Sequence, residues 1–141
     1  MNKFNKLVYP LITVITLYLV MCIQTQAAVI LQYHHVSEST PKSTSISPVQ
    51  FEKHLKYLAD NNFTVVPLST IIETIKEQKP LADKIVSITF DDAYIDNLTH
   101  AKPLLDKFNY PFTIFVNPAT INHNSKNHLS WEQLKRLSDE G

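Results

Sequence analysis

The sequence lacks the residues that would support thiol chemistry. Its one cysteine, Cys22, lies in an N-terminal apolar run and is lost if that run is removed as a leader. A mature chain without cysteine can form no disulfide and offers no thiolate, which excludes thiol catalysis and cysteine-ligated metal sites. Any metal ion must therefore be held by histidine, aspartate or glutamate.

Basic residues are too few and too dispersed to neutralise a phosphate backbone. The chain has 13 lysines and arginines against 13 aspartates and glutamates, and no basic cluster. Loss of Lys3 and Lys6 with a leader would make the net charge slightly negative. Because nucleic-acid binding depends on concentrated positive charge, we expect no nucleic-acid partner.

The N-terminus has the organisation of a secretory leader. Two lysines precede an apolar run from Leu7 to Ile23, and Thr25-Gln26-Ala27 offers small residues suited to signal peptidase. We predict a signal peptide over residues 1–27 and an exported domain over residues 28–141, in the periplasm, the cell envelope or the medium. The alternative is an uncleaved anchor. Pro10 and several polar residues leave that run barely long enough to span a bilayer, so we expect no stable membrane anchor after cleavage.

Four short runs rich in β-branched and aromatic residues predict strands at residues 29–33, 63–66, 85–90 and 112–116. A stretch rich in Ser, Thr and Pro, residues 37–47, predicts an exposed loop. Between the strands, helical spacing of apolar residues predicts right-handed βαβ units and a parallel sheet, which is the α/β class. Four parallel strands make no closed barrel, so we expect only part of a larger fold.

Helix starts are marked by capping residues. Ser47-Pro48-Val49-Gln50 and Ser130-Trp131-Glu132-Gln133 have the pattern of a capping box. We also predict Ser69 as the N-cap of a helix after the second strand. Thr99 is the predicted N-cap after the third strand, which would place Pro103 in the first turn, where proline is tolerated.

The adjacent carboxylates Asp91 and Asp92 are the leading candidates for chemistry. They follow the most apolar strand, and in parallel α/β folds the loops at the carboxyl ends of strands build the active site. Two neighbouring carboxylates near an apolar strand end repel each other unless a cation or a shared proton compensates. A divalent metal held by one carboxylate, with the other accepting a proton from water, would suit hydrolysis of an amide or ester. The plainer alternative is that one aspartate caps the next helix.

The histidines and the tryptophan are weaker candidates. His34 ends the first strand and could line the pocket, whereas strand alternation points His35 elsewhere. Trp131 could stack on a sugar ring, although packing is the simpler role. Asn97-Leu98-Thr99 matches a glycosylation sequon, which we interpret as the approach to a helix. The remaining histidines are predicted to be solvated or packing groups: His54, His100, His123 and His128.

The run Thr89-Phe90-Asp91-Asp92-Ala93-Tyr94 resembles the first motif, TFDDG, of the polysaccharide deacetylases, also called the NodB-homology or carbohydrate esterase 4 family. Tyr33-His34-His35-Val36 resembles the opening strand of the poly-N-acetylglucosamine deacetylase branch. The segments 111–116 and 129–131 are similar to later parts of the same branch. The resemblance spans residues 29–141, and only the aspartate pair is specific.

This resemblance implies the N-terminal portion of a deformed (β/α) barrel of parallel strands that removes N-acetyl groups from an N-acetylglucosamine-type polysaccharide. Asp91 would be the catalytic base, and Asp92 would ligate a divalent ion, by implication zinc. His34, Tyr94 and Trp131 would line the pocket. Ala93 replaces the usual glycine, and a positive φ there would cost about 1 kcal/mol.

Two other functions remain open. A glycoside hydrolase would use paired acids, although such enzymes need carboxylates several ångströms apart across the sugar bond. A carbohydrate-binding remnant would keep the fold without catalysis. The family's His-[Ser/Thr]-x-x-His ligands do not occur in the sequence, so we expect the 141-residue chain to bind metal weakly and to catalyse little.

Overall fold

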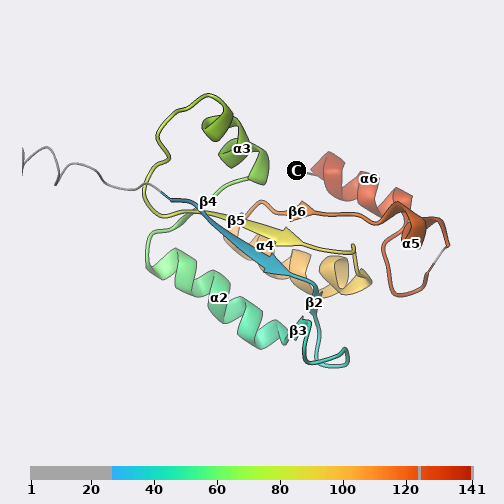
Figure 1. Ribbon diagram of the computed structural model, residues 1–141. Helices are drawn as coiled ribbons and strands as arrows, with labels where there is room; N and C mark the ends of the chain where they lie inside the picture. Colours follow the sequence, from blue (N-terminus) through green and yellow to red (C-terminus); the bar gives the residue numbers. More distant parts are fainter. Residues whose placement is uncertain (1–26, 124, 141) are drawn as a thin grey trace, which may run out of the picture.

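The computed structural model describes residues 27–123 and 125–140, and it is built on one central strand (Figure 1). In this strand, β5 (Ile85–Phe90), the last five residues pair with the whole of β1 (Val29–Tyr33). β4 (Thr64–Val65) pairs with its beginning and β6 (Thr113–Ile114) with its end. All three pairings are parallel, so the predicted α/β class with parallel strands is confirmed. β4 and β6 are shorter than the sequence predicts.

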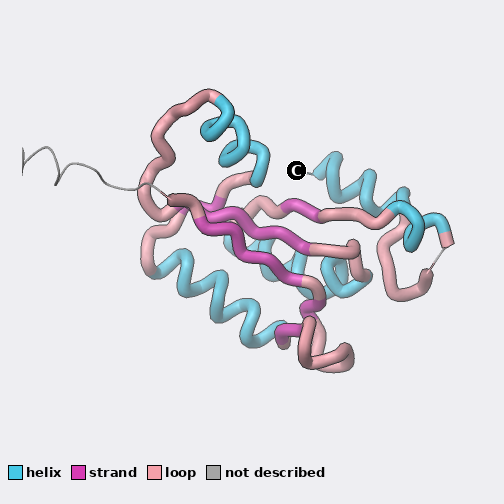
Figure 2. The backbone as a smooth tube through the Cα atoms, in the orientation of Figure 1, coloured by secondary structure: helices cyan, strands magenta, loops and turns pink. Residues whose placement is uncertain are grey.

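Helices connect the strands (Figure 2). They are α2 (Pro48–Asp60), α3 (Leu68–Lys76), α4 (Lys102–Phe108), α5 (Pro118–Asn122) and α6 (Trp131–Glu140), with a π-helical turn, η1 (Asn97–Ala101), before α4. α2 and α4 cover one face of β5, where Phe51, Leu55, Phe90 and Leu105 are fully buried. A second, smaller cluster joins the loop after β5 to α5 and α6, and its buried members are Ala93, Ile121, Leu129 and Leu137. The loop that carries the aspartates therefore has its own apolar base.

Two of the four predicted helix starts are confirmed. The Ser47 hydroxyl accepts a bond of 3.2 Å from the Gln50 amide at the start of α2. At α6 the capping box is complete, because Ser130 and Gln133 each accept from the other's amide through a side-chain oxygen, at 3.2 and 2.8 Å. These signals depend only on residues within one turn, so the local sequence is sufficient to specify them.

The other two helix starts are wrong. α3 begins at Leu68 after Pro67, not at Ser69, since the fixed φ of proline already suits a helix entry. Thr99 lies inside η1, and its hydroxyl donates to the Ile95 carbonyl at 3.3 Å. Pro103 has no amide hydrogen to donate to the carbonyl four residues earlier, which accounts for the wider π turn that precedes α4.

The predicted loop over residues 37–47 contains an element that the sequence did not indicate. β3 (Ser45–Ile46) pairs in parallel with β2 (His35–Val36), and Val36 is fully buried. α5 likewise lies between the predicted fourth strand and the helix start at Ser130, where the sequence predicts no element, and Asn117 caps it. The predicted signal peptide, apart from Ala27, lies outside the described residues. Within 27–123 and 125–140, every helix is too short or too polar to cross a bilayer.

Candidate active site

Asp91 and Asp92 occupy the carboxyl end of β5, where the backbone turns sharply. The Asp91 amide still donates to the Tyr33 carbonyl at 2.9 Å, which extends the pairing of β1 and β5. The next two residues have positive φ, 65° for Asp92 and 54° for Ala93. The position of Ala93 is therefore left-handed, so the cost anticipated from the missing glycine applies. Each left-handed non-glycine residue costs about 1–2 kcal/mol, which the surrounding contacts must offset.

Backbone bonds hold this turn from the side of α6. The Leu129 amide donates to the Ala93 carbonyl at 2.9 Å, and the Ile95 amide donates to the Asn127 carbonyl at 2.8 Å. The Ala93 methyl group is fully buried against Leu129 in the second apolar cluster. The turn is thus fixed by a segment more than thirty residues further along the chain.

Asp91 lies among side chains from the end of β1. Gln32 donates a hydrogen bond from its amide nitrogen to one Asp91 carboxylate oxygen. The same oxygen lies 3.8 Å from the His34 Nε2, and the His34 and Asp91 side chains are 35% and 26% exposed. The three groups therefore form a half-open polar cluster in which the carboxylate can meet both a donor and solvent.

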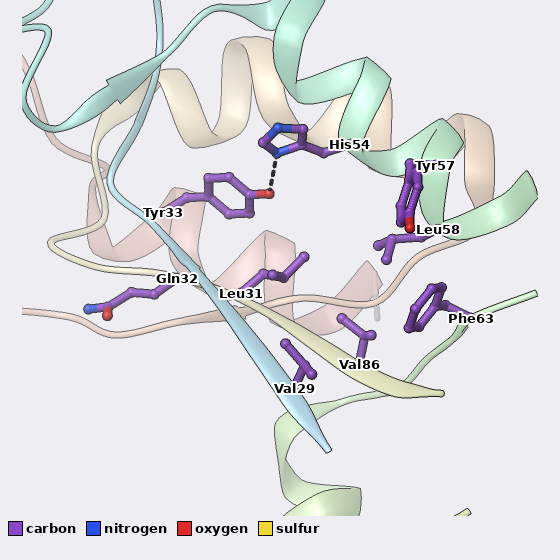
Figure 3. Close-up of a pocket in the computed structure, with 9 residues that line it drawn as sticks. All are labelled: Val29, Leu31, Gln32, Tyr33, His54, Tyr57, Leu58, Phe63 and Val86. Carbon is purple, nitrogen blue, oxygen red and sulfur yellow. Dashed lines mark hydrogen bonds between the residues drawn. The ribbon is translucent and has the colours of Figure 1, made fainter. Parts of the chain in front are cut away.

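Gln32 is a site residue that our reading of the sequence missed. Strand alternation places it on the face of β1 opposite Leu31 and Tyr33, and Figure 3 shows its side chain pointing away from theirs. A polar residue inside an otherwise apolar strand was the available signal, but its partner Asp91 is 59 residues away.

Tyr94 lies on the other side of the pair, next to Asp92. Burial raises the pKa of the Tyr94 hydroxyl, and the nearby Asp92 carboxylate raises it further. The ring of Tyr94 stacks on His35, with centroids 3.6 Å apart, and contacts the ring of His128, with centroids 4.7 Å apart. With imidazoles against the ring of Tyr94, its hydroxyl and edge are the parts best placed to contact a ligand.

His54 and His100 make structural hydrogen bonds, which agrees with the prediction that they are solvated or packing groups. His54 shares a hydrogen bond of 2.9 Å with the Tyr33 hydroxyl (Figure 3), and His100 bonds to the Val36 carbonyl at 2.8 Å. His35 diverges from His34, as alternation predicts, and it is buried against Asp96, with 2.7 Å between the His35 Nδ1 and a carboxylate oxygen.

Trp131 and the sequon asparagine have structural partners. Trp131 opens α6 with half of its surface exposed, and its indole N–H donates to the Asn122 side chain of α5 at 2.9 Å. Asn97 is fully buried, and its amide donates to the His34 carbonyl at 2.8 Å. A buried asparagine engaged in this way is not accessible for glycosylation, so the sequon has a structural role.

Two hollows with mixed polar and apolar walls lie beside the neighbours of the aspartate pair. One, of about 200 Å³, is lined by Gln32, His34 and His35 and by residues of β3. Another, of about 500 Å³, is lined by Tyr94, His35 and Asp96 together with hydroxyl-bearing residues of the 37–40 loop. A third pocket, of about 480 Å³, lies between β1 and α2 and is almost wholly apolar (Figure 3). Neither Asp91 nor Asp92 lines any of these three hollows, but their neighbours Gln32 and His34 line the first and Tyr94 lines the second.

The donor set of the described residues fits only part of a metal site. Asp91, Asp92 and His34 are the potential ligands at this end of the sheet, and their side chains face different partners. Within 27–123 and 125–140, no group of three or more His, Cys, Asp or Glu side chains converges as a metal site would require. Tetrahedral zinc needs four ligands, of which protein side chains supply at least three. These residues alone therefore do not complete a zinc site.

Comparison with known proteins finds similarity to polysaccharide deacetylases. A family model described as polysaccharide deacetylase matches residues 78–141. The chain is 38% identical over 113 residues to the protein named polysaccharide deacetylase YxkH from Bacillus subtilis (strain 168). It is 28% identical over 85 residues to the poly-beta-1,6-N-acetyl-D-glucosamine N-deacetylase of Escherichia coli (strain K12). These regions cover 79% and 59% of this chain, but only 39% and 13% of the two relatives.

Solved structures give the same result for the fold. IcaB from Ammonifex degensii aligns with a TM-score of 0.74 and 30% identity, over 84% of this chain and 51% of that chain. The Streptococcus pyogenes deacetylase PplD in complex with acetate aligns with a TM-score of 0.73 and 25% identity, over 83% and 54%. The chain thus corresponds to about half of a deacetylase barrel, which confirms the predicted fold and its incompleteness.

Proposed function

Because the chain belongs to the polysaccharide deacetylase family by sequence and fold, we propose that Asp91 and Asp92 are the carboxylates of a hydrolase that removes N-acetyl groups from an N-acetylglucosamine-type polysaccharide. The main support for the proposal is that the two carboxylates have different neighbours. Asp91 faces Gln32 and His34, whereas Asp92 faces Tyr94. Two carboxylates in different environments can take different roles.

Asp91 is the proposed base. Its carboxylate is partly exposed, so water and an acetamide group can approach it, and the bond from Gln32 fixes one of its oxygens. The other oxygen is then available to accept a proton from the attacking water. The His34 Nε2 lies 3.8 Å from the oxygen that Gln32 bonds. In this proposal Asp91 accepts the proton, and Gln32 and His34 orient its carboxylate.

Asp92 is the proposed metal ligand. The family is generally metal-dependent, and a bound divalent ion, which we propose to be zinc, would polarise the acetamide carbonyl and activate water. The described residues supply too few converging donors, so we propose that further ligands come from outside them. Export of the mature protein to the envelope or medium, where such polymers occur, is part of the same proposal.

The test uses a longer version of the protein that deacetylates N-acetylglucosamine oligomers. Asp91→Asn should lower acetate release by about 10²–10⁴-fold, since a general base contributes that much. Asp92→Asn should reduce the bound zinc measured after dialysis. The matched control is Asp106→Asn, because Asp106 makes an exposed ion pair with Lys102 on α4. Unchanged turnover after both Asp91→Asn and Asp92→Asn would refute the proposal.

A second test concerns the 141-residue chain itself. We propose that it binds zinc weakly and releases little acetate, because its donor set is incomplete. The same observation favours the second candidate function, a non-catalytic carbohydrate-binding remnant, for this polypeptide. Rapid turnover by the purified chain would show that the ligands counted here are sufficient.

A paired-acid glycoside hydrolase fits the geometry less well. Its carboxylates must lie on opposite sides of a sugar bond, about 5–9.5 Å apart. Asp91 and Asp92 are adjacent in sequence and share one turn. Release of reducing sugar ends without release of acetate would favour that function instead.

A further inference from the structure

A buried hydrogen-bonded pair, His35 and Asp96, lies behind the aspartate loop, and the chemistry proposed above does not use it. One oxygen of Asp96 lies 2.7 Å from the His35 Nδ1, and the other accepts the Val36 amide at 2.9 Å. The two side chains are only 10% and 9% exposed. Since a carboxylate can only accept, the His35 Nδ1 is the donor. Both carboxylate oxygens of Asp96 therefore bond to β2.

Two further contacts connect β2 and the end of β1 to the same loop. The ring of His35 stacks on Tyr94, with centroids 3.6 Å apart and an interplanar angle of 28°. The buried amide of Asn97 donates to the His34 carbonyl at 2.8 Å. Residues 94–97 are thus bound on one side to residues 34–36. On the other side, the backbone bonds donated by Leu129 and Ile95 join the loop to residues 127–129.

These contacts surround the two left-handed residues. Asp92 and Ala93 have φ values of 65° and 54°, which non-glycine residues keep only where the surroundings determine the backbone. Without contacts on the far side of the loop, both residues would gain by returning to right-handed or extended conformations. The direction of the Asp92 carboxylate would change with them, because φ at that residue sets where its Cβ points.

We propose that His35 and Asp96, with Tyr94 stacked on His35, are positioning residues that hold the Asp91–Asp92 loop in its left-handed conformation. Their importance for catalysis rests on the proposed function, but the conformational claim does not. The competing explanation is that the pair only adds to the stability of the fold. In that case the loop would keep its shape in any variant that remains folded.

The first experiment compares ¹³Cα and ¹³Cβ chemical shifts of Asp92 and Ala93, which distinguish left-handed from right-handed backbone, in the full chain and its variants. Asp96→Ala should abolish the left-handed shifts and increase hydrogen exchange of the 92–95 amides roughly tenfold or more. Leu55→Ala is the matched control, because it removes fully buried side-chain volume from the core under α2. It should weaken the fold and leave the loop shifts unchanged.

Rescue gives a sharper criterion. Glycine accepts positive φ without a steric cost, so Ala93→Gly in the Asp96→Ala background should restore part of the left-handed population. If Asp96→Ala does not fold, Tyr94→Leu replaces it, since this change removes the stack and leaves the hydrogen bond between His35 and Asp96 in place. Left-handed shifts and slow exchange that persist in the folded Asp96→Ala or Tyr94→Leu variant would overturn the proposal.

Kinetics of an active longer version separate this inference from the proposed function. Asp96→Ala should lower kcat with little change in KM, because the loop is displaced while the polymer-binding surface stays intact. If Asp91→Asn and Asp92→Asn retain activity, the proposed function fails while the shift measurements still decide the conformational claim. If those variants are inactive and Asp96→Ala has the kcat, KM and loop shifts of the unmodified protein, the positioning role fails alone.

Discussion

Ala93→Gly tests whether the aspartate loop is left-handed in solution. Three free-energy terms contribute to the change in stability. Glycine relieves the left-handed penalty, about 1–2 kcal/mol. It loses a fully buried methyl group, about 0.8 kcal/mol. It also makes the unfolded chain more flexible, which costs about 0.4–1 kcal/mol. The gain and the two losses nearly cancel, so we expect the free energy of unfolding to change by less than about 1 kcal/mol.

Ala101→Gly is the matched comparison. Ala101 is also fully buried, but its φ of −72° and ψ of −49° are right-handed. The same two losses apply there without any relief, so we expect a destabilisation of about 1.2–1.8 kcal/mol. The difference between the two variants isolates the left-handed penalty at position 93.

Urea unfolding of both variants measures this difference. With a slope of about 1–3 kcal/mol/M, a gap of 1–2 kcal/mol separates the two midpoints by several tenths of a molar or more. Equal destabilisation by Ala93→Gly and Ala101→Gly would refute the reasoning, because it would mean that residue 93 has an ordinary right-handed or extended backbone.

Two other predictions concern the scaffold. Ser130→Ala should destabilise the protein by about 1 kcal/mol, because it removes an N-cap that bonds the Gln133 amide. Ser138→Ala is the control and should have no such effect, since Ser138 is exposed on α6. Thermal unfolding of the two variants compares their stability. Burial raises the pKa of the Tyr33 hydroxyl from 10.0 to about 12, so the unfolded chain loses this proton first and stability should fall between pH 10 and 12 and then level off. Urea midpoints across that range should fall less steeply for Tyr33→Phe than for the unmodified protein, and a control at the exposed Tyr57, Tyr57→Phe, should keep the original slope.

Features that depend on a few neighbouring residues were predictable. β5 is an apolar run of six residues, and two carboxylates follow it directly. The capping box at α6 needs only Ser130 and Gln133, three residues apart. At α3 and α4, the helix start depends on a proline, Pro67 or Pro103, whose φ is fixed. The caps predicted from side-chain type, Ser69 and Thr99, are therefore wrong.

The surroundings of the aspartates were only partly predictable. The prediction that His34 and His35 point apart needed only their adjacency in an extended chain, and the structure places His34 near Asp91 and His35 against Asp96. That adjacency could not indicate that His35 pairs with Asp96, 61 residues later, or that Gln32 meets Asp91 across the sheet. Such contacts depend on the register between β1 and β5, which pairs Tyr33 with Phe90.

The sequence by itself determined the class of fold, the place of the aspartate pair at a strand end and the resemblance that assigns a family. These follow from hydrophobic period and from one short motif, both of which are local. Only the tertiary structure decided that Asp92 and Ala93 are left-handed and that Asp91 and Asp92 face different partners. The physical reason is that a strained turn persists only through contacts from distant segments, here residues 34–36 and 127–129.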